Sequence, residues 1–301
     1  MMRRSNVILI IFILFLSVSC KQGVKEKDSF KPVFSTYKSD TANSHLPLPK
    51  NEIFYGILTP VEMCTIFNRL GITYNNAALN PIANRDLYLS ISKASINTGI
   101  YGADFGYLKL FGIGQQMIDY MVTIRDMCSK LGIPDSYLTG PIKQVENDIA
   151  DPDTILYLMN DAYTKMEAHL REGGRESTAG LMIMGGWVEA MYIATRFVYN
   201  PDRPDSEVVQ KIAQQKYTLT TLLSFLKNYY DDPVVVYYSK KLKYLKNYFD
   251  SFDIYFKKGD LEIDTAKQVF RSTGSQMTVT VETLNKIRDY VAKLRTEMVT
   301  P

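Results

Sequence analysis

The sequence predicts an all-α protein, a helical bundle of roughly eight to ten helices. Residues typical of helix starts and stops follow one another along the chain after residue 50. Between them, apolar residues recur at the helical steps of three and four. No Asn-Gly or Asp-Gly hairpin turn occurs, and no segment alternates polar and apolar residues for long. These observations assign residues 51–301 to one all-helical domain.

The first predicted helices carry clear boundary residues. "TPVE", residues 59–62, is a capping box with proline at the first helical position, and Gly71 is a typical stop. "NPIANRDLYLSISKASINTG" begins a new helix, with Asn80 as its cap and Pro81 at the first position.

A core stripe predicts the next helix, over residues 113–131. Its apolar residues recur at alternating steps of four and three, and Gly132 and Pro134 follow as stops. The stripe consists of Met117, Met121, Ile124, Cys128 and Leu131.

The rest of the chain continues in helical segments. "MTVTV" is the nearest approach to a strand, and it leads into the last helix, from about residue 281 to 298. The other predicted helices are "TGPIKQVENDIA", "DPDTILYLMNDAYTKMEAHLREGG", "ESTAGLMIMGGWVEAMYIATRFV", "DSEVVQKIAQQKYTLTTLLSFLKNYY" and "DPVVVYYSKKLKYLKNYFDSF".

An internal similarity suggests repeated helical hairpins. "GIGQQMIDYMVTIRDM" (112–127) and "KIAQQKYTLTTLLSFL" (211–226) share Ile-x-Gln-Gln and the apolar spacing after it. Each segment follows a glycine-rich helix, 96–112 and 178–199. A duplicated hairpin would give this order. Chance similarity between two amphipathic helices is the alternative.

The N-terminus has the layout of a secretory signal. Arg3 and Arg4 precede a ten-residue apolar run, and short residues lead to Cys20. The run is too short for a membrane span, which needs about 20 apolar residues. This layout resembles a bacterial lipoprotein signal, although Ser17 stands where that signal prefers leucine. The resemblance implies removal of residues 1–19 and lipidation of Cys20. An ordinary secretory signal that ends in cysteine is the alternative.

Residues 20–50 are expected to form the lipidated cysteine and a flexible tether. They are rich in Lys, Ser, Asp and Pro and lack sustained periodicity, so their typical reach is roughly 30 Å. Lys21 is not the acidic residue that retains many lipoproteins at the inner membrane, which by analogy points to the outer membrane. Without residues 1–19 the chain has 33 basic and 32 acidic residues, a balance that argues against nucleic-acid binding.

The stretch "INTGIYGADFGYLKLFG", residues 96–112, is unusually rich in glycine for a helix. Gly99, Gly102 and Gly106 share one helix face, which favours close contact with another helix such as the one containing "AGLMIMGGW". Alternatively, the glycines leave room for a ligand next to Asp104, Tyr101 and Tyr107, or Asp104 caps a new helix.

The same stretch carries a family resemblance. "TGIYGADFGYLKLFG…QQ" resembles a segment of uncharacterised helical lipoproteins of Bacteroidetes-type bacteria. The resemblance covers the signal and roughly residues 59–132. It implies an envelope location and a helical fold, and it brings no catalytic residue.

Tyrosines make a second candidate binding region. Tyr244 and Tyr248 lie with Tyr237 and Tyr255 on a flank rich in lysine, beside a core stripe. Exposed tyrosine is common where proteins meet proteins or sugars. The alternative is that these rings widen the core contact. The core stripe consists of Tyr238, Leu242, Leu245 and Phe249, and the lysines are Lys240, Lys241, Lys243 and Lys246.

Motifs for enzyme chemistry are scarce. His169 is the one histidine of the predicted domain, and Cys64 and Cys128 are isolated, so no metal site is predicted. Export would allow these two cysteines to pair, but both lie in apolar helical patterns that suit buried thiols. "SISK", residues 90–93, matches Ser-x-x-Lys without its companion boxes. No cofactor is predicted.

Three function classes follow from the sequence. The first is a membrane-anchored lipoprotein that acts as a binding or scaffolding module for an envelope protein. The second is a lipoprotein that captures a small molecule or glycan near Asp104 and the tyrosines. The third, a hydrolase built on carboxylates, needs two acids that converge in a cleft.

Overall fold

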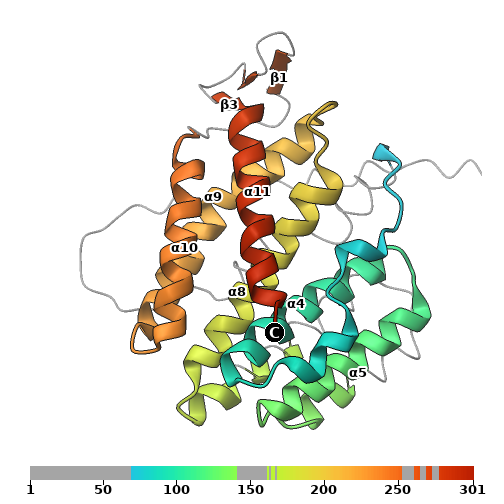
Figure 1. Cartoon of the computed structure of the whole chain (residues 1–301), viewed down its shortest axis with the longest axis vertical. Helices are drawn as coiled ribbons and strands as arrows, with labels where there is room; N and C mark the ends of the chain where they lie inside the picture. The colour runs from blue at the N-terminus through green and yellow to red at the C-terminus, as the bar shows by residue number, and fades with distance from the viewer. Residues whose placement is uncertain are drawn as a thin grey trace, which may run out of the picture. The chain divides into compact units, whose positions relative to one another are not determined.

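The computed structural model describes residues 69–140, 161–252 except 163 and 167, 261–264, 269–272 and 278–301. All of them belong to the unit that spans Pro47–Pro301. The fold is an all-α helical bundle, as predicted, with one small sheet (Figure 1). The predicted signal, Cys20, the tether, the 59–62 capping box and the helix expected over "TGPIKQVENDIA" lie outside the described residues, the last except for its first two positions.

Two glycine-rich helices cross in the centre of the bundle. They are α4 (Ile91–Leu110) and α8 (Glu176–Ile193). A Cβ atom on Gly99 would lie 1.9 Å from the carbonyl oxygen of Met182, and one on Gly185 would lie 2.0 Å from that of Ile96. The predicted close contact between these two helices is therefore confirmed at Gly99. Gly102 and Gly106 take no part in it, since nothing lies within 4 Å of their Cβ positions.

The crossing is reciprocal. Each glycine lies against the carbonyl of the residue three positions before the other glycine. A duplicated hairpin would produce such a crossing, and the duplication stays a prediction. The paired glutamines differ in their surroundings: Gln215 Oε1 accepts a hydrogen bond from Trp187 Nε1 at 3.2 Å, whereas Gln116 Oε1 accepts one from the Tyr74 hydroxyl.

The start of α4 differs from the prediction. Residues 82–87 form the 3₁₀ helix η2 (Ile82–Leu87), and a shorter one, η1 (Asn76–Ala78), precedes it. The α-helix begins only after Ser90, whose hydroxyl accepts a hydrogen bond from the Lys93 backbone N–H at 3.1 Å. Asn80 is no cap because its side chain bonds Tyr88 in the core instead.

The predicted stripe of residues 113–131 forms α5 (Gly114–Lys130), which packs on α4. Four of its members are buried and Ile124 is half-buried. Gly112 and Gly132 follow α4 and α5 with φ of +64°, a conformation that glycine adopts without steric cost.

Three capped helices complete the bundle. α9 (Ser206–Leu226) and α10 (Pro233–Asp250) begin at the aspartates that the sequence indicates, and each aspartate accepts two backbone N–H bonds. α11 (Val281–Val299) begins at Thr280 and packs on α8 and α10. The π-turn η3 (Ala194–Val198) extends α8, and η4 (Lys227–Tyr229) follows α9.

The small sheet was not predicted from the sequence. β1 (Leu261–Asp264), β2 (Val269–Ser272) and β3 (Thr278–Thr280) pair antiparallel in the order β1-β2-β3, with Ile263 opposite Phe270 and Phe270 opposite Val279. β3 lies in "MTVTV" and leads directly into α11. β1 and β2 have four residues each, too few for an alternation to be recognised.

α8 is a buried core helix. Residues 176–198 are long and apolar enough to span a membrane by length and composition, but they are mostly buried inside the fold. Trp187 and Met184 on this helix are among the most completely buried side chains. Glu189 is buried as well, so this helix carries a charge into the core.

Candidate functional site

The structure separates the predicted binding residues into two groups. Asp104, Tyr101 and Tyr107 are buried in the centre of the bundle. Tyr244 is 52% exposed on α10, and Tyr248 is half-buried one turn further along. The two groups therefore form an interior polar cluster and an exposed surface.

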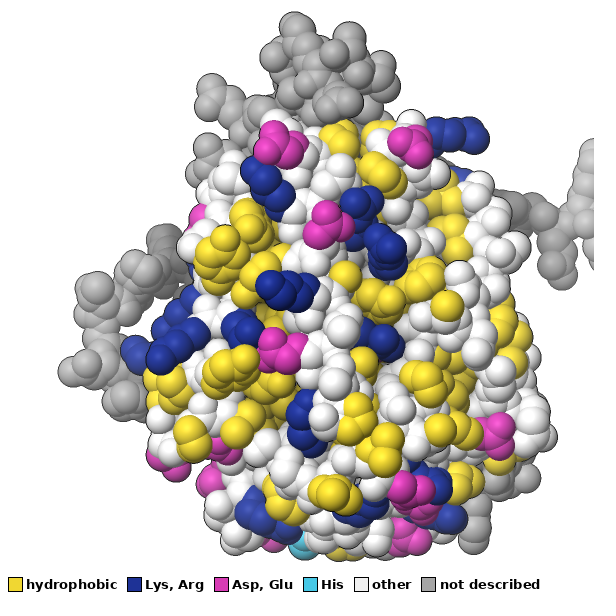
Figure 2. All heavy atoms as spheres, viewed as in Figure 1, with side chains coloured by type: hydrophobic (Ala, Val, Ile, Leu, Met, Phe, Trp, Pro, Cys, Tyr) yellow, Lys and Arg dark blue, Asp and Glu magenta, His cyan; other side chains and the backbone are white. Residues whose placement is uncertain are grey.

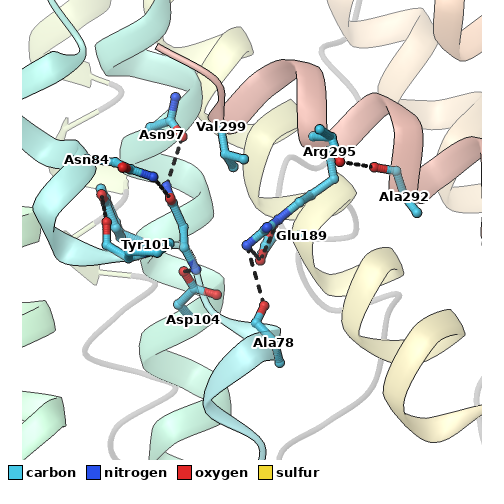
Figure 3. Close-up of polar contacts among 12 residues, drawn as sticks. Ala78, Asn84, Asn97, Tyr101, Asp104, Glu189, Ala292, Arg295 and Val299 are labelled. Atoms are coloured by element: carbon cyan, nitrogen blue, oxygen red, sulfur yellow. Dashed lines mark hydrogen bonds and ion pairs between the residues drawn. The ribbon is translucent and has the colours of Figure 1, made fainter.

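Three ionisable side chains meet in the interior, each from a different helix (Figure 3). Arg295 on α11 donates from Nε to Glu189 Oε2 and from Nη2 to Glu189 Oε1, both at 2.9 Å. Asp104 on α4 lies beside this pair. Burial lowers the pKa of Arg295, but the Glu189 carboxylate outweighs it and the pKa is raised overall. Arg295 also lies over the ring of Tyr192, 4.6 Å from its centroid.

Asp104 and Glu189 form a pair of neighbouring buried acids. Asp104 Oδ1 has no hydrogen-bond partner among the described residues, while both Glu189 oxygens accept hydrogen bonds from Arg295. Burial, then the Glu189 charge, raises the pKa of Asp104 well above its ordinary value. Burial also raises the pKa of Glu189, but the charge of Arg295 and its hydrogen bonds oppose this shift. The proton therefore belongs to Asp104, and Glu189 is the ion that pairs with Arg295.

Asn80 connects this pair to the segment before α4. Its backbone N–H donates to Asp104 Oδ2 at 3.0 Å, and its side-chain Nδ2 donates to the Tyr88 hydroxyl at 3.0 Å and to Asn97 Oδ1 at 3.1 Å. Tyr88 and Asn97 in turn donate to the carbonyls of Val299 and Met298 at 2.8 and 3.0 Å. The network thus fixes the C-terminal end of α11.

The buried tyrosines hold backbone rather than an open site. Tyr101 donates to the Pro81 carbonyl at 3.0 Å, and the Tyr107 hydroxyl accepts from the Asn75 backbone N–H at 3.1 Å. Tyr120 donates to the Asn80 carbonyl at 2.8 Å. These bonds tie residues 75–81 to α4 and α5. A ligand role for Asp104, Tyr101 and Tyr107 stays a prediction, and in this packing a ligand would have to open the core to reach them.

A carboxylate hydrolase needs two acids that converge and a cleft through which the substrate reaches them, and only the first condition is met. Two carboxyl groups converge, but Asp104 and Glu189 are both 0% exposed. A substrate in solvent does not contact them in this packing. The arrangement suits a structural network in which every charge is compensated, since Glu189 is paired and Asp104 is neutral.

Glu189 and Arg295 were not predicted from the sequence as partners of Asp104. Glu189 stands out as the one acid in the apolar run of residues 178–194, which marks it as a buried charge. Arg295 occupies a buried position in the α11 stripe of Leu284, Ile287, Val291 and Met298. A basic residue at a core position is the signal that could have identified it.

The exposed group forms what we call the α10–α11 face, in which the two helices pack against each other (Figure 1). The Tyr290 hydroxyl donates to the Lys241 carbonyl at 3.1 Å, and Lys241 Nζ binds Glu297 Oε2 at 2.8 Å. Figure 2 shows hydrophobic and basic side chains interspersed over this side. The face consists of Tyr237, Lys240, Lys241, Tyr244, Tyr248, Tyr290 and Lys293.

Three tyrosine rings of this face touch one another. Tyr244 lies 5.1 Å from Tyr290 and 5.6 Å from Tyr248 between ring centroids, and Tyr248 lies 6.2 Å from Tyr290. Tyr248 and Tyr290 are half-buried against the core, whereas Tyr237 and Tyr244 are 48% and 52% exposed. The core-contact alternative therefore holds for Tyr248, and binding through the exposed rings stays a prediction. Tyr255 lies outside the described residues.

The cysteine, histidine and Ser-x-x-Lys residues considered for enzyme chemistry make contacts typical of a structural role. No group of three metal-ligating side chains occurs among the described residues. Cys128 is a free thiol 3.7 Å from the Met166 sulfur, and burial raises its pKa to about 12, while Cys64 lies outside the described residues. Ser90 of "SISK" caps α4, and Lys93 Nζ binds the carbonyls of Glu297, Met298 and Thr300. His169 Nε2 lies 3.0 Å from the Gly132 carbonyl oxygen.

Comparison with models of protein families, with curated proteins and with solved structures gives no match to this chain.

Proposed function

We propose that this chain is a cell-envelope lipoprotein that acts as a binding or scaffolding module. It is anchored through a lipid on Cys20, in the outer membrane, and its folded domain binds an envelope partner through the α10–α11 face. The basic n-region, the short apolar run and the cysteine that follows support the anchor. Lys21 supports the outer membrane.

The exposure of Tyr237 and Tyr244 carries the binding proposal. A tyrosine ring that is half exposed beside other rings offers a rigid contact area with few torsions to fix. Tyr244 rests on Tyr290, so a partner would not need to order it first. Tyrosine is also enriched among the residues that dominate protein interfaces.

Capture from membranes tests the binding proposal. Tagged, lipidated protein is recovered from gently solubilised membranes as wild type, Tyr244→Ala and Tyr217→Ala, and bound protein and carbohydrate are quantified. Tyr217 on α9 is 57% exposed and serves as the matched control. Truncation of a tyrosine that dominates an interface costs about 2 kcal/mol of binding free energy. This loss corresponds to roughly thirtyfold weaker binding. We expect one component to fall by that order with Tyr244→Ala alone; equal recovery with all three proteins contradicts the proposal.

Lipid labelling tests the anchor separately. Cells that make the wild-type chain or Cys20→Ala are grown with radiolabelled palmitate and fractionated. We expect label and outer-membrane localisation for the wild type only, because a lipidated N-terminus with several acyl chains attaches stably. Release of unlabelled wild-type protein into the soluble fraction would contradict the anchor.

A further inference from the structure

The α10–α11 face alternates aromatic and basic side chains along both helices. On α10 the order is Tyr237, Lys240 and Lys241, then Tyr244. On α11, Tyr290 is followed one turn later by Lys293. Residues three and four apart share a helix face, so rings and ammonium groups lie next to one another. The Lys241 ammonium lies 4.8 Å from the centroid of the Tyr237 ring.

The positive charge of this region is only partly neutralised. Lys241 pairs with Glu297 at 2.8 Å. Among the described residues, no carboxylate pairs with Lys240, Lys243 or Lys293, while the other acids of α11 are engaged with basic neighbours. The chain as a whole is close to neutral after removal of residues 1–19, so this surplus of cations is local. Charge complementarity calls for an anionic partner.

We infer that the α10–α11 face binds an acidic glycan, a polysaccharide of uronic-acid type. This inference rests on the proposed binding function and names the chemical class of the partner. The apolar faces of the sugar rings would lie on Tyr237 and Tyr244, and the sugar carboxylates would pair with Lys240 and Lys293. Tyrosine suits such a ligand, because its ring is apolar and its hydroxyl accepts and donates hydrogen bonds.

The alternation favours a glycan over an acidic protein segment. Each unit of a uronic-acid polymer carries both a ring and a carboxylate, which matches a face that repeats both kinds of group. An acidic peptide supplies carboxylates to the lysines and leaves the exposed rings of Tyr237 and Tyr244 without matching rings. The carboxylates and the sugar rings of the ligand therefore contribute separately to its affinity. Comparing a polymer that has both groups with a polymer that has only carboxylates distinguishes the two contributions.

The test uses full-length protein solubilised in detergent and three polymers. Polygalacturonate has rings and carboxylates, poly-L-glutamate has carboxylates without sugar rings, and dextran has rings without charge. We expect polygalacturonate to bind at least tenfold more tightly than either of the others. Tyr244→Ala should weaken polygalacturonate binding at least tenfold and leave poly-L-glutamate binding unchanged. The double variant Lys240→Gln/Lys293→Gln should weaken both.

Matched controls and contrary outcomes complete the design. Tyr217→Ala and Lys227→Gln alter an exposed tyrosine and an exposed lysine away from the face and should change nothing. Equal affinity for the two polyanions, with no effect of Tyr244→Ala, overturns the inference, and so does absence of polygalacturonate binding. If membrane capture then still yields a protein that depends on Tyr244, the glycan class fails and the binding module stands.

Discussion

Asp104 is the residue at which burial decides the chemistry. It is fully buried, accepts the Asn80 backbone N–H at 3.0 Å through Oδ2 and leaves Oδ1 without a hydrogen-bond partner among the described residues. A second carboxylate beside Glu189 would leave the cluster with an uncompensated negative charge, so the neutral acid is the stable form. An asparagine would offer the same acceptor and a donor in place of the acid proton.

Asp104→Asn should therefore preserve the fold and flatten the dependence of stability on pH. The pKa of Asp104 is raised in the folded state. The folded chain thus holds a proton that the unfolded chain releases above about pH 4. The stability this gives is fully present below pH 4 and is lost as the pH rises toward the folded-state pKa. We expect the variant to be at least as stable as wild type at pH 7, measured by denaturant unfolding between pH 4 and 8.

Asp289→Asn is the control for this series, since Asp289 is exposed. It should retain the wild-type slope. A wild-type slope in Asp104→Asn together with a large loss of stability at pH 7 would show that Asp104 is ionised in the fold.

Arg295→Met should leave the Glu189 carboxylate buried without its partner. Removal of one member of a buried ion pair costs about 3–5 kcal/mol, because the remaining charge stays desolvated. Lys293→Met, two positions away and exposed, should change the free energy of unfolding by less than about 0.5 kcal/mol. Chemical denaturation of both variants at pH 7 measures the difference, and equal stabilities would contradict the pairing.

At the scale of elements, the crossing of α4 and α8 depends on two glycines. Helical glycine costs about 1 kcal/mol relative to alanine, and contact between the two backbones offsets this. Gly99→Ala would place a methyl group 1.9 Å from the Met182 carbonyl oxygen, and neither backbone can yield without separating the helices.

Gly99→Ala should consequently destabilise the protein by at least about 3 kcal/mol, the upper end of ordinary overpacking. Gly102→Ala, on the same helix with nothing within 4 Å of its Cβ position, should stabilise it by up to about 1 kcal/mol. Thermal and denaturant unfolding compare the two variants. Similar effects of both substitutions would mean that the helices do not cross at Gly99.

Elements with their own boundary residues could be predicted from the sequence. α9 and α10 begin at capping aspartates, and α5 follows its apolar stripe. Asn80 has the residue type of a helix cap, but its side chain forms hydrogen bonds in the core instead. These bonds involve residues outside its local sequence, such as Asn97, so they could not be predicted from the local sequence. The interior site could be predicted only in part for the same reason. Asp104 could be identified from its own stretch of sequence, whereas its proximity to Glu189 and Arg295 arises only when α4, α8 and α11 pack together.

At the scale of the whole molecule, the buried cluster of Asp104, Glu189 and Arg295 is distinct from the exposed α10–α11 face. The interior network fixes the ends of helices, and its acids do not meet solvent. The α10–α11 face carries exposed rings and lysines without acid partners among the described residues. We therefore propose that binding occurs on that face and that Asp104, Glu189 and Arg295 contribute to stability.

Site-specific photocrosslinking in living cells tests this most directly. A benzoyl-phenylalanine replaces Tyr244 in the lipid-anchored protein, and the same replacement at Tyr217 is the control. We expect a discrete adduct with one envelope component from position 244 and none from position 217. No adduct from position 244, or the same adducts from both positions, would contradict binding through the α10–α11 face.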